Sequence, residues 1–275
     1  MLKLNSGLLP VTRSLRLEYA VSVVIAIIMV VVSTVGIMYR SVLYPTEKLF
    51  IGFVSSDLLN IFVGLPVLLL SMRLTRRGRL TGLLCWPGAL FYVLHIFTSY
   101  IAIPVSVLFI PHIFLIILSA YSIIGIIVSI NADAVRQRLS GVVPAKTTGW
   151  ILTSVAILVI VYLIVQIITV LINQTQPDNV ELVQWIDDLV VGSPPLLVGG
   201  YLLLRRKALG YVAGAGLLLM CSMLFIGVIP AMVFQALSAD MPIDVIGILI
   251  VLISGMVCFI PFVLFVRGAA KTRIL

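Results

Sequence analysis

The stretch FIGFVSSDLLNIFVGLPVLLLSM, residues 50–72, is followed directly by the basic turn RLTRRGR, residues 73–79. At 1.5 Å per residue, a helix over the apolar stretch is long enough to cross a hydrocarbon core of about 30 Å. Arginine side chains are costly inside hydrocarbon, so the basic turn marks the surface where this crossing ends. The two segments together predict a transmembrane helix.

Seven more apolar runs of similar length lie on both sides of this stretch, at 17–39, 80–101, 103–130, 150–172, 184–204, 209–235 and 243–266. Hydrophobic residues make up 62% of the chain and charged residues only 10%, which leaves too little polar surface for a water-soluble globule. We therefore expect an all-α fold, a polytopic membrane helical bundle of eight transmembrane helices. An even number of crossings puts both termini on the same side.

The basic residues sort strongly between the two sides of this expected bundle. Only Arg40 and Lys48 fall on one side, and sixteen fall on the other: Lys3, Arg13, Arg16, Arg73, Arg76, Arg77, Arg79, Arg136, Arg138, Lys146, Arg205, Arg206, Lys207, Arg267, Lys271 and Arg273. The positive-inside rule then predicts a multi-pass protein of the cell membrane with both termini cytoplasmic. The clusters sit at helix ends with no aromatic platform between them, which indicates contact with membrane lipid and no nucleic-acid partner.

An internal repeat is visible when the sequence is shifted by 128 positions. Glycine, proline and arginine residues then coincide without gaps: Gly64 with Gly192, Pro66 with Pro194, Arg77 with Arg205, Gly82 with Gly210, and Gly88 with Gly216. The shift predicts two four-helix repeats, 1–140 and 141–275, in one membrane domain. Four crossings per repeat give both the same orientation, so the repeats are expected to be parallel. The prolines are expected to kink the second and sixth helices.

The polar residues inside the expected helices gather in the outer half of the membrane. Asp57 lies about 9 Å below the outer end of the second helix, and an acidic side chain at such a depth normally faces the bundle interior. We expect these residues to line one outward-opening pocket between the repeats: Asp57, Asn60, Tyr92, His95, Ser99, His112, Asp187 and Asp188. Structural explanations compete with this one, namely a hydrogen bond for Asp57, helix capping for the aspartate pair, packing for the histidines, and an outer aromatic belt for Tyr92, Tyr100 and Trp185.

Three segments carry a family resemblance. They are DLLNIFVGLP at 57–66, the basic turn at 73–79 and WPGALFYVL at 86–94, together with Arg205, Arg206, Gly210 and Tyr211 later in the chain. This pattern resembles an uncharacterised family of prokaryotic multi-pass membrane proteins, in which an acidic residue precedes G-L-P in one helix. The resemblance covers about 50–130 and 185–215 and implies the membrane architecture. It implies no activity.

Three functional hypotheses remain open at this point. The first is binding or transport of a small polar or cationic solute through the outer pocket, since transporter sites commonly lie at repeat interfaces beside broken helices. The second is a membrane-embedded metal enzyme in which His95, His112 and Asp57 hold a divalent ion, although no established zinc-binding spacing supports it. The third is a packing or assembly protein without a small ligand. The sequence favours a role other than catalysis and predicts no cofactor.

Overall fold

A computed structural model describes residues 9–238 and 242–272 of the chain, so Lys3 and Arg273 lie outside the described residues. Eight helices or helix pairs in it are long and apolar enough to cross a membrane: Arg16–Met38, Glu47–Arg76, Leu80–Ala102, Phe109–Ser129, Ala145–Asn173, Asn179–Leu204, Ala208–Leu237 and Val245–Lys271. Within the described residues the only β pairing is one isolated bridge between Val11 and Ile130. The predicted all-α fold with eight candidate spans is confirmed.

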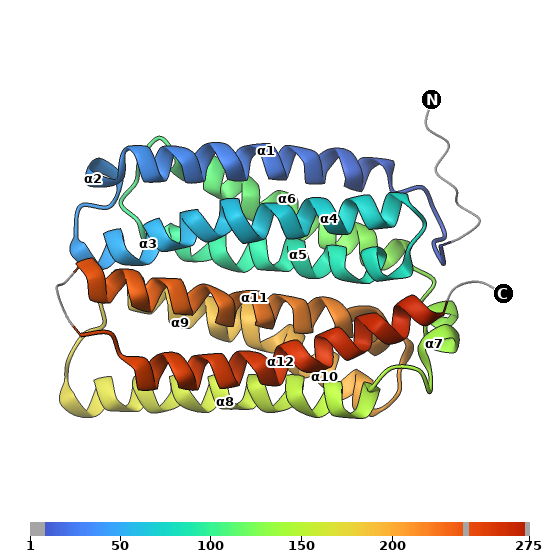
Figure 1. Cartoon of the computed structure of the whole chain (residues 1–275). Helices are drawn as coiled ribbons and strands as arrows, with labels where there is room; N and C mark the ends of the chain where they lie inside the picture. Colours follow the sequence, from blue (N-terminus) through green and yellow to red (C-terminus); the bar gives the residue numbers. More distant parts are fainter. Residues whose placement is uncertain (1–8, 239–241, 273–275) are drawn as a thin grey trace.

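The first half of the chain contains α1 (Arg16–Met38), α2 (Arg40–Leu43), α3 (Glu47–Leu59), η1 (Asn60–Gly64), α4 (Leu65–Arg76), α5 (Leu80–Ser99), η2 (Tyr100–Ala102), α6 (Phe109–Ser129) and α7 (Ala132–Leu139). The second half contains α8 (Ala145–Asn173), α9 (Asn179–Asp187), η3 (Asp188–Gly192), α10 (Ser193–Leu204), α11 (Ala208–Ser238) and α12 (Val245–Lys271). In Figure 1 the long helices run side by side, with α1 and α3–α6 in the upper part and α8–α12 in the lower part. The start of α1, the end of α12 and the short helix α7 lie at one end of the bundle.

Helix α5 forms the centre of the bundle. Most of its length is buried inside the protein, whereas the corresponding share for α8 is small. Trp86 is fully buried and its indole N–H donates to the hydroxyl of Ser22 on α1 at 3.1 Å. Helix α5 packs against α4, α6 and α11, so it joins the two halves of the molecule.

Helices α5 and α11 touch each other at Gly88 and Gly216. A Cβ placed on Gly88 would collide with the backbone of Gly216, and one placed on Gly216 would lie 3.0 Å from the amide nitrogen of Gly88. Glycine permits this because association in lipid relies on close packing, and a helix without a side chain lets another backbone approach. The close contact requires glycine on both helices.

Two transmembrane helices are interrupted by a five-residue π-helical segment. Asn60–Gly64 separates α3 from α4, and Asp188–Gly192 separates α9 from α10. In each case the residue after the segment, Leu65 or Ser193, donates its N–H five residues back rather than four. The proline that follows in the first helical turn has no N–H to donate, and the wider turn accommodates that loss. The sequence located both interruptions as proline kinks, and the structure makes each a π-helical segment.

One expected span is shorter in the structure than the sequence predicted. The apolar run 103–130 is helical only from Phe109, because Pro104 lies in a non-helical connection after η2. The charged segment after this run is itself helical: α7 buries Val135 and Leu139 against the bundle and leaves Arg136 exposed. Helix α7 packs against α11.

The acidic residue at the start of α1 has a structural partner. Arg13 donates to Glu18 at 2.5 Å, to the hydroxyl of Ser129 at 2.5 Å and to the carbonyl of Gly125 at 3.1 Å. Glu18 is almost fully buried, so its pairing with Arg13 offsets the cost of burying a carboxylate. The contact fastens the beginning of α1 to the end of α6.

Candidate functional site

The eight candidate residues lie mainly in two groups of contacts on either side of α5. We call the first the Asp57 cluster, made of Ser33, Tyr44, Asp57, Asn60, Tyr92 and Tyr100. We call the second the His95 cluster, made of His95, Ser99, Asp187 and Asp188. Both depend on α5, because Tyr92 contributes to the first cluster and His95, one turn further along, to the second.

The carboxylate of Asp57 is fully buried and accepts a hydrogen bond on each oxygen. Tyr44 donates to Oδ2 at 2.7 Å and Tyr100 donates to Oδ1 at 2.8 Å. Burial, reinforced by the carboxylate, raises the pKa of the Tyr44 hydroxyl, so that group stays protonated and donates. Gly36 on α1 makes room for the pair, because a Cβ there would collide with Asp57 Oδ2. The geometry is that of a carboxylate with its hydrogen bonds satisfied.

Asn60 extends the same cluster by one turn. Its amide nitrogen donates to the hydroxyl of Ser33 at 3.3 Å, and its amide oxygen accepts from the hydroxyl of Tyr92 at 3.3 Å. All three side chains are buried, and they connect α1, η1 and α5. This cluster therefore ties three spans of the first half together.

His112 borders the Asp57 cluster through its ring. The ring centroid lies 4.9 Å from that of Tyr100 and 5.6 Å from that of Phe97. The side chain is buried and its Nε2 has no hydrogen-bond partner. His112 thus packs against aromatic rings, and no group of three or more histidine, cysteine or acidic side chains suited to a metal ion occurs in residues 9–238 and 242–272.

The His95 cluster joins the two halves of the molecule. Nδ1 of His95 lies 3.0 Å from Oδ2 of Asp187, and Nε2 lies 3.6 Å from Oδ1 of Asp188. The hydroxyl of Ser99 donates to Oδ2 of Asp187 at 3.4 Å. The imidazole also lies close to Gly192, where an added Cβ would be 3.3 Å from its Cε1. An imidazole is therefore held between two consecutive aspartates at the start of a π-helical segment.

The His95 cluster has unused hydrogen-bonding capacity and an excess of negative charge. Oδ1 of Asp187 is buried without a hydrogen-bond partner. Two carboxylates face one imidazole, so a protonated His95 cannot neutralise both of them when both are ionised. The side chain of Asp187 is 1% exposed and that of Asp188 is 34% exposed. Asp188 is thus the more exposed of the two carboxylates.

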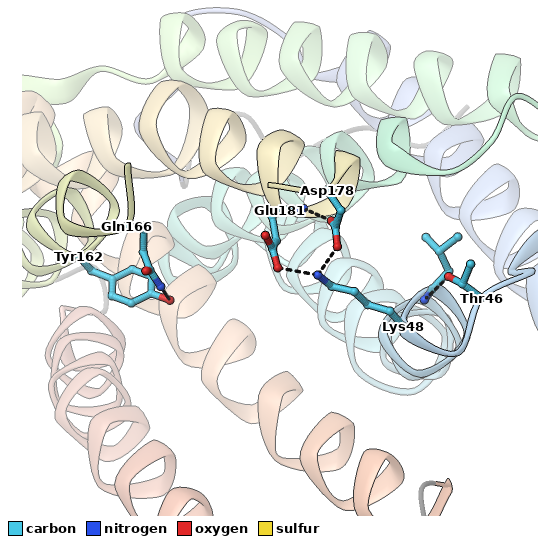
Figure 2. A network of polar contacts seen from close by, with 7 residues as sticks. Thr46, Lys48, Tyr162, Gln166, Asp178 and Glu181 are labelled. Carbon is cyan, nitrogen blue, oxygen red and sulfur yellow. Dashed lines mark hydrogen bonds and ion pairs between the residues drawn. The ribbon is translucent and has the colours of Figure 1, made fainter. Parts of the chain in front are cut away.

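A second acidic group lies at the beginning of α9, next to this cluster in sequence. Figure 2 shows the ammonium of Lys48 between two carboxylates, 2.5 Å from Asp178 and 2.7 Å from Glu181. The hydrogen bond from Lys48 lowers the pKa of Asp178, which also caps α9 by accepting from the Glu181 amide. The contact links the start of α3 to the start of α9, so it holds the two halves of the molecule together.

The sequence identified the acidic and imidazole groups but missed the tyrosines that bind them. Tyr100 was named only under the competing explanation of an outer aromatic belt, yet it is fully buried and donates to Asp57. Tyr44 lies in a short connection for which no role was expected. A tyrosine near the end of a span fits a membrane interface and a buried donor equally well, so only the packing separates the two.

Two cavities in the bundle lie away from the candidate residues. One, of about 410 Å³, lies among α5, α6, α10 and α11, and another, of about 170 Å³, lies between α11 and α12. Neither is lined by any of the eight. A single outward-opening pocket that contains both clusters therefore stays a prediction.

No protein-family model, curated protein or solved structure matches this chain. The family resemblance thus rests on the sequence pattern alone, and the function has to be argued from the geometry.

Proposed function

We propose that this chain is a multi-pass protein of the cell membrane with both termini cytoplasmic, and that it binds a small monovalent cation in its outer half. The orientation is supported by the basic turns, which join the described helices at the end that carries α7. The basic residues at the opposite end are Arg40 and Lys48, and Lys48 pairs with two acids. The His95 cluster then lies toward the outside.

The proposal includes two parallel repeats, 1–140 and 141–275. Helices α4 and α10 begin and end 128 positions apart, and so do η1 and η3. The glycine pair that touches at the centre, Gly88 and Gly216, is also 128 positions apart, as expected for residues beside a pseudo-two-fold axis. A site at the contact between α5 and α9 would lie between the repeats.

The observation that carries cation binding is the buried, unpartnered Oδ1 of Asp187 beside a second carboxylate. Within the described residues, the ion pairs recorded for Asp187 and Asp188 involve only His95. An uncompensated negative charge inside a membrane is expensive, and a bound cation removes that cost. The carboxylate oxygens of Asp187 and Asp188 are hard donors suited to such an ion.

The test is the binding of sodium and of methylammonium to the purified protein at constant ionic strength, with choline as the bulky replacement ion. A ligand that binds the folded state raises the melting temperature. We expect the melting temperature to rise with one of the two probes. The Asp188→Asn variant should bind that probe with an apparent affinity at least tenfold lower. Asp178→Asn, which removes an acid already paired with Lys48, serves as the matched control and should leave the affinity unchanged.

Two outcomes would refute the proposal. One is a protein whose melting temperature responds to neither probe. The other is an equal loss of affinity in the Asp188→Asn and Asp178→Asn variants, because general screening of acidic charge would then explain the response.

A further inference from the structure

The cavity of about 410 Å³ is a groove bounded by four helices. Its floor is the crossing of α5 and α11, with Gly88 and Gly216 among its lining residues, and its walls are α6 and α10. Every one of its lining residues is apolar. Small residues create the space, namely Ala120 on α6, Gly199 on α10 and Ala213 on α11.

The groove lies among membrane-spanning segments and toward the end of the bundle that carries α7. It is lined by the second half of α6, from Ala120 to Ile127, and by the first residues of α11. An apolar groove at this depth would be filled by hydrocarbon, since a polar solute would lose its hydrogen bonds there. The shape and the lining therefore fit an acyl chain.

The basic turn at 205–207 identifies the kind of lipid. Leu202 and Leu209 both line the groove, and the turn between them contributes Arg205, Arg206 and Lys207, all exposed. Basic residues at a membrane surface attract anionic headgroups, worth about 1 kcal/mol per residue. A phospholipid whose chain enters the groove at this end would have its phosphate beside these three cations.

We propose that this groove and the turn at 205–207 form a specific site for an anionic phospholipid of the same leaflet, distinct from the His95 cluster. The acyl chain occupies the groove over the Gly88–Gly216 contact, and the headgroup pairs with the basic turn. The lipid fills the space between α6 and α10, one wall from each half of the chain.

The test compares lipid retention by native mass spectrometry after purification in detergent and addition of phosphatidylglycerol or phosphatidylcholine with identical acyl chains. We expect the unaltered protein to retain phosphatidylglycerol at least fivefold more than phosphatidylcholine. The double variant Ala120→Phe/Val198→Phe, which fills the groove, should lose most of this retention. Val128→Phe/Val161→Phe places the same rings on exposed positions outside the groove and should retain lipid normally.

The headgroup contact has its own matched pair of variants. Arg205→Gln/Lys207→Gln should abolish the preference for the anionic lipid, whereas Arg77→Gln/Arg79→Gln removes two charges from the turn before α5 and should keep it. Equal retention of the two lipids by the unaltered protein, or undiminished retention by the groove-filled variant, would overturn the proposal. A preference that survives Arg205→Gln/Lys207→Gln would overturn it as well.

Discussion

Under the proposed repeat, the contact between α5 and α9 corresponds to the contact between α3 and α11, yet only the first has a recognised pairing of polar side chains. A shift of 128 positions puts Met223 in place of His95, Leu59 in place of Asp187, and Gly227 in place of Ser99. In the second contact a Cβ on Gly227 would lie 3.0 Å from Leu59, and the rings of Phe50 and Phe234 are 5.4 Å apart. An apolar set of side chains is thus enough to join these helices.

The comparison separates what assembly needs from what it does not. Helices pack in lipid through close apolar contacts, and ionisable groups add a cost that packing alone does not require. Buried ion pairs are often no more stable than apolar side chains of similar volume. The difference between the two contacts therefore supports the proposed binding role of His95, Asp187 and Asp188.

The comparison depends on the two halves meeting at Gly88 and Gly216, and the largest effect on stability is expected there. Gly88→Ala adds one methyl group against the backbone of α11, which cannot move away as a side chain can. We expect a loss of about 3 kcal/mol, at the upper end of the usual range for overpacking. Thermal unfolding in detergent measures it. Gly52→Ala is the control, because a Cβ at Gly52 would contact nothing within 4 Å, and a similar loss there would contradict this explanation.

An intermediate effect is expected in the Asp57 cluster, whose hydrogen bonds are satisfied within the protein. Asp57→Asn keeps the shape of the side chain but replaces one acceptor oxygen with an NH2 group. One of the two tyrosine hydroxyls then loses its hydrogen-bond acceptor. We expect a loss of about 2 kcal/mol of stability, in the range for hydrogen bonds to charged groups, with cation affinity unchanged. Melting temperature and cation titration on the same sample distinguish the two roles. A weakened affinity with normal stability would move the binding site to Asp57.

The smallest effect is expected at the exposed pairing of Lys48 with Asp178 and Glu181. The pKa of Asp178 is lower in the folded protein than its ordinary value of about 3.9. The stability that its charge contributes is therefore fully present above about pH 3.9 and is lost as the pH falls through the lower folded-state pKa. The pair is exposed to water, so we expect Asp178→Asn to cost less than about 1 kcal/mol at neutral pH. Asparagine can still cap α9, so the substitution removes the charge of Asp178 without removing the helix cap. Melting temperatures in low and high salt check this, and a cost that salt does not reduce would contradict an electrostatic origin.

The sequence predicted the eight candidate spans because long apolar runs bounded by basic turns leave few alternatives. It also located Asp57, His95, Asp187 and Asp188 as groups that need partners, since ionisable residues inside apolar helices are easily recognised. It did not predict which partner each would take. Tyr44 and Tyr100 come from connections whose path depends on packing, and the π-helical segments set the direction of Asn60 and Asp188.

The partner of each polar residue could therefore not be predicted from the sequence and is known only from the structure. Asp57 and His95 were expected in one pocket, whereas the structure gives Asp57 two tyrosine donors and gives His95 the aspartate pair. Both arrangements agree with the same spacing along α5, because residues 92, 95, 99 and 100 point toward neighbouring sectors of one helix.

The most direct test of cation binding replaces the polar contact with its own counterpart. The variant His95→Met/Asp187→Leu/Asp188→Asn carries the residues found 128 positions away, and both cation titration and thermal unfolding are measured on it. We predict that it folds with equal or higher stability than the unaltered protein and that its melting temperature no longer responds to sodium or methylammonium. A folded variant that still responds to the cation as the unaltered protein does would contradict the account.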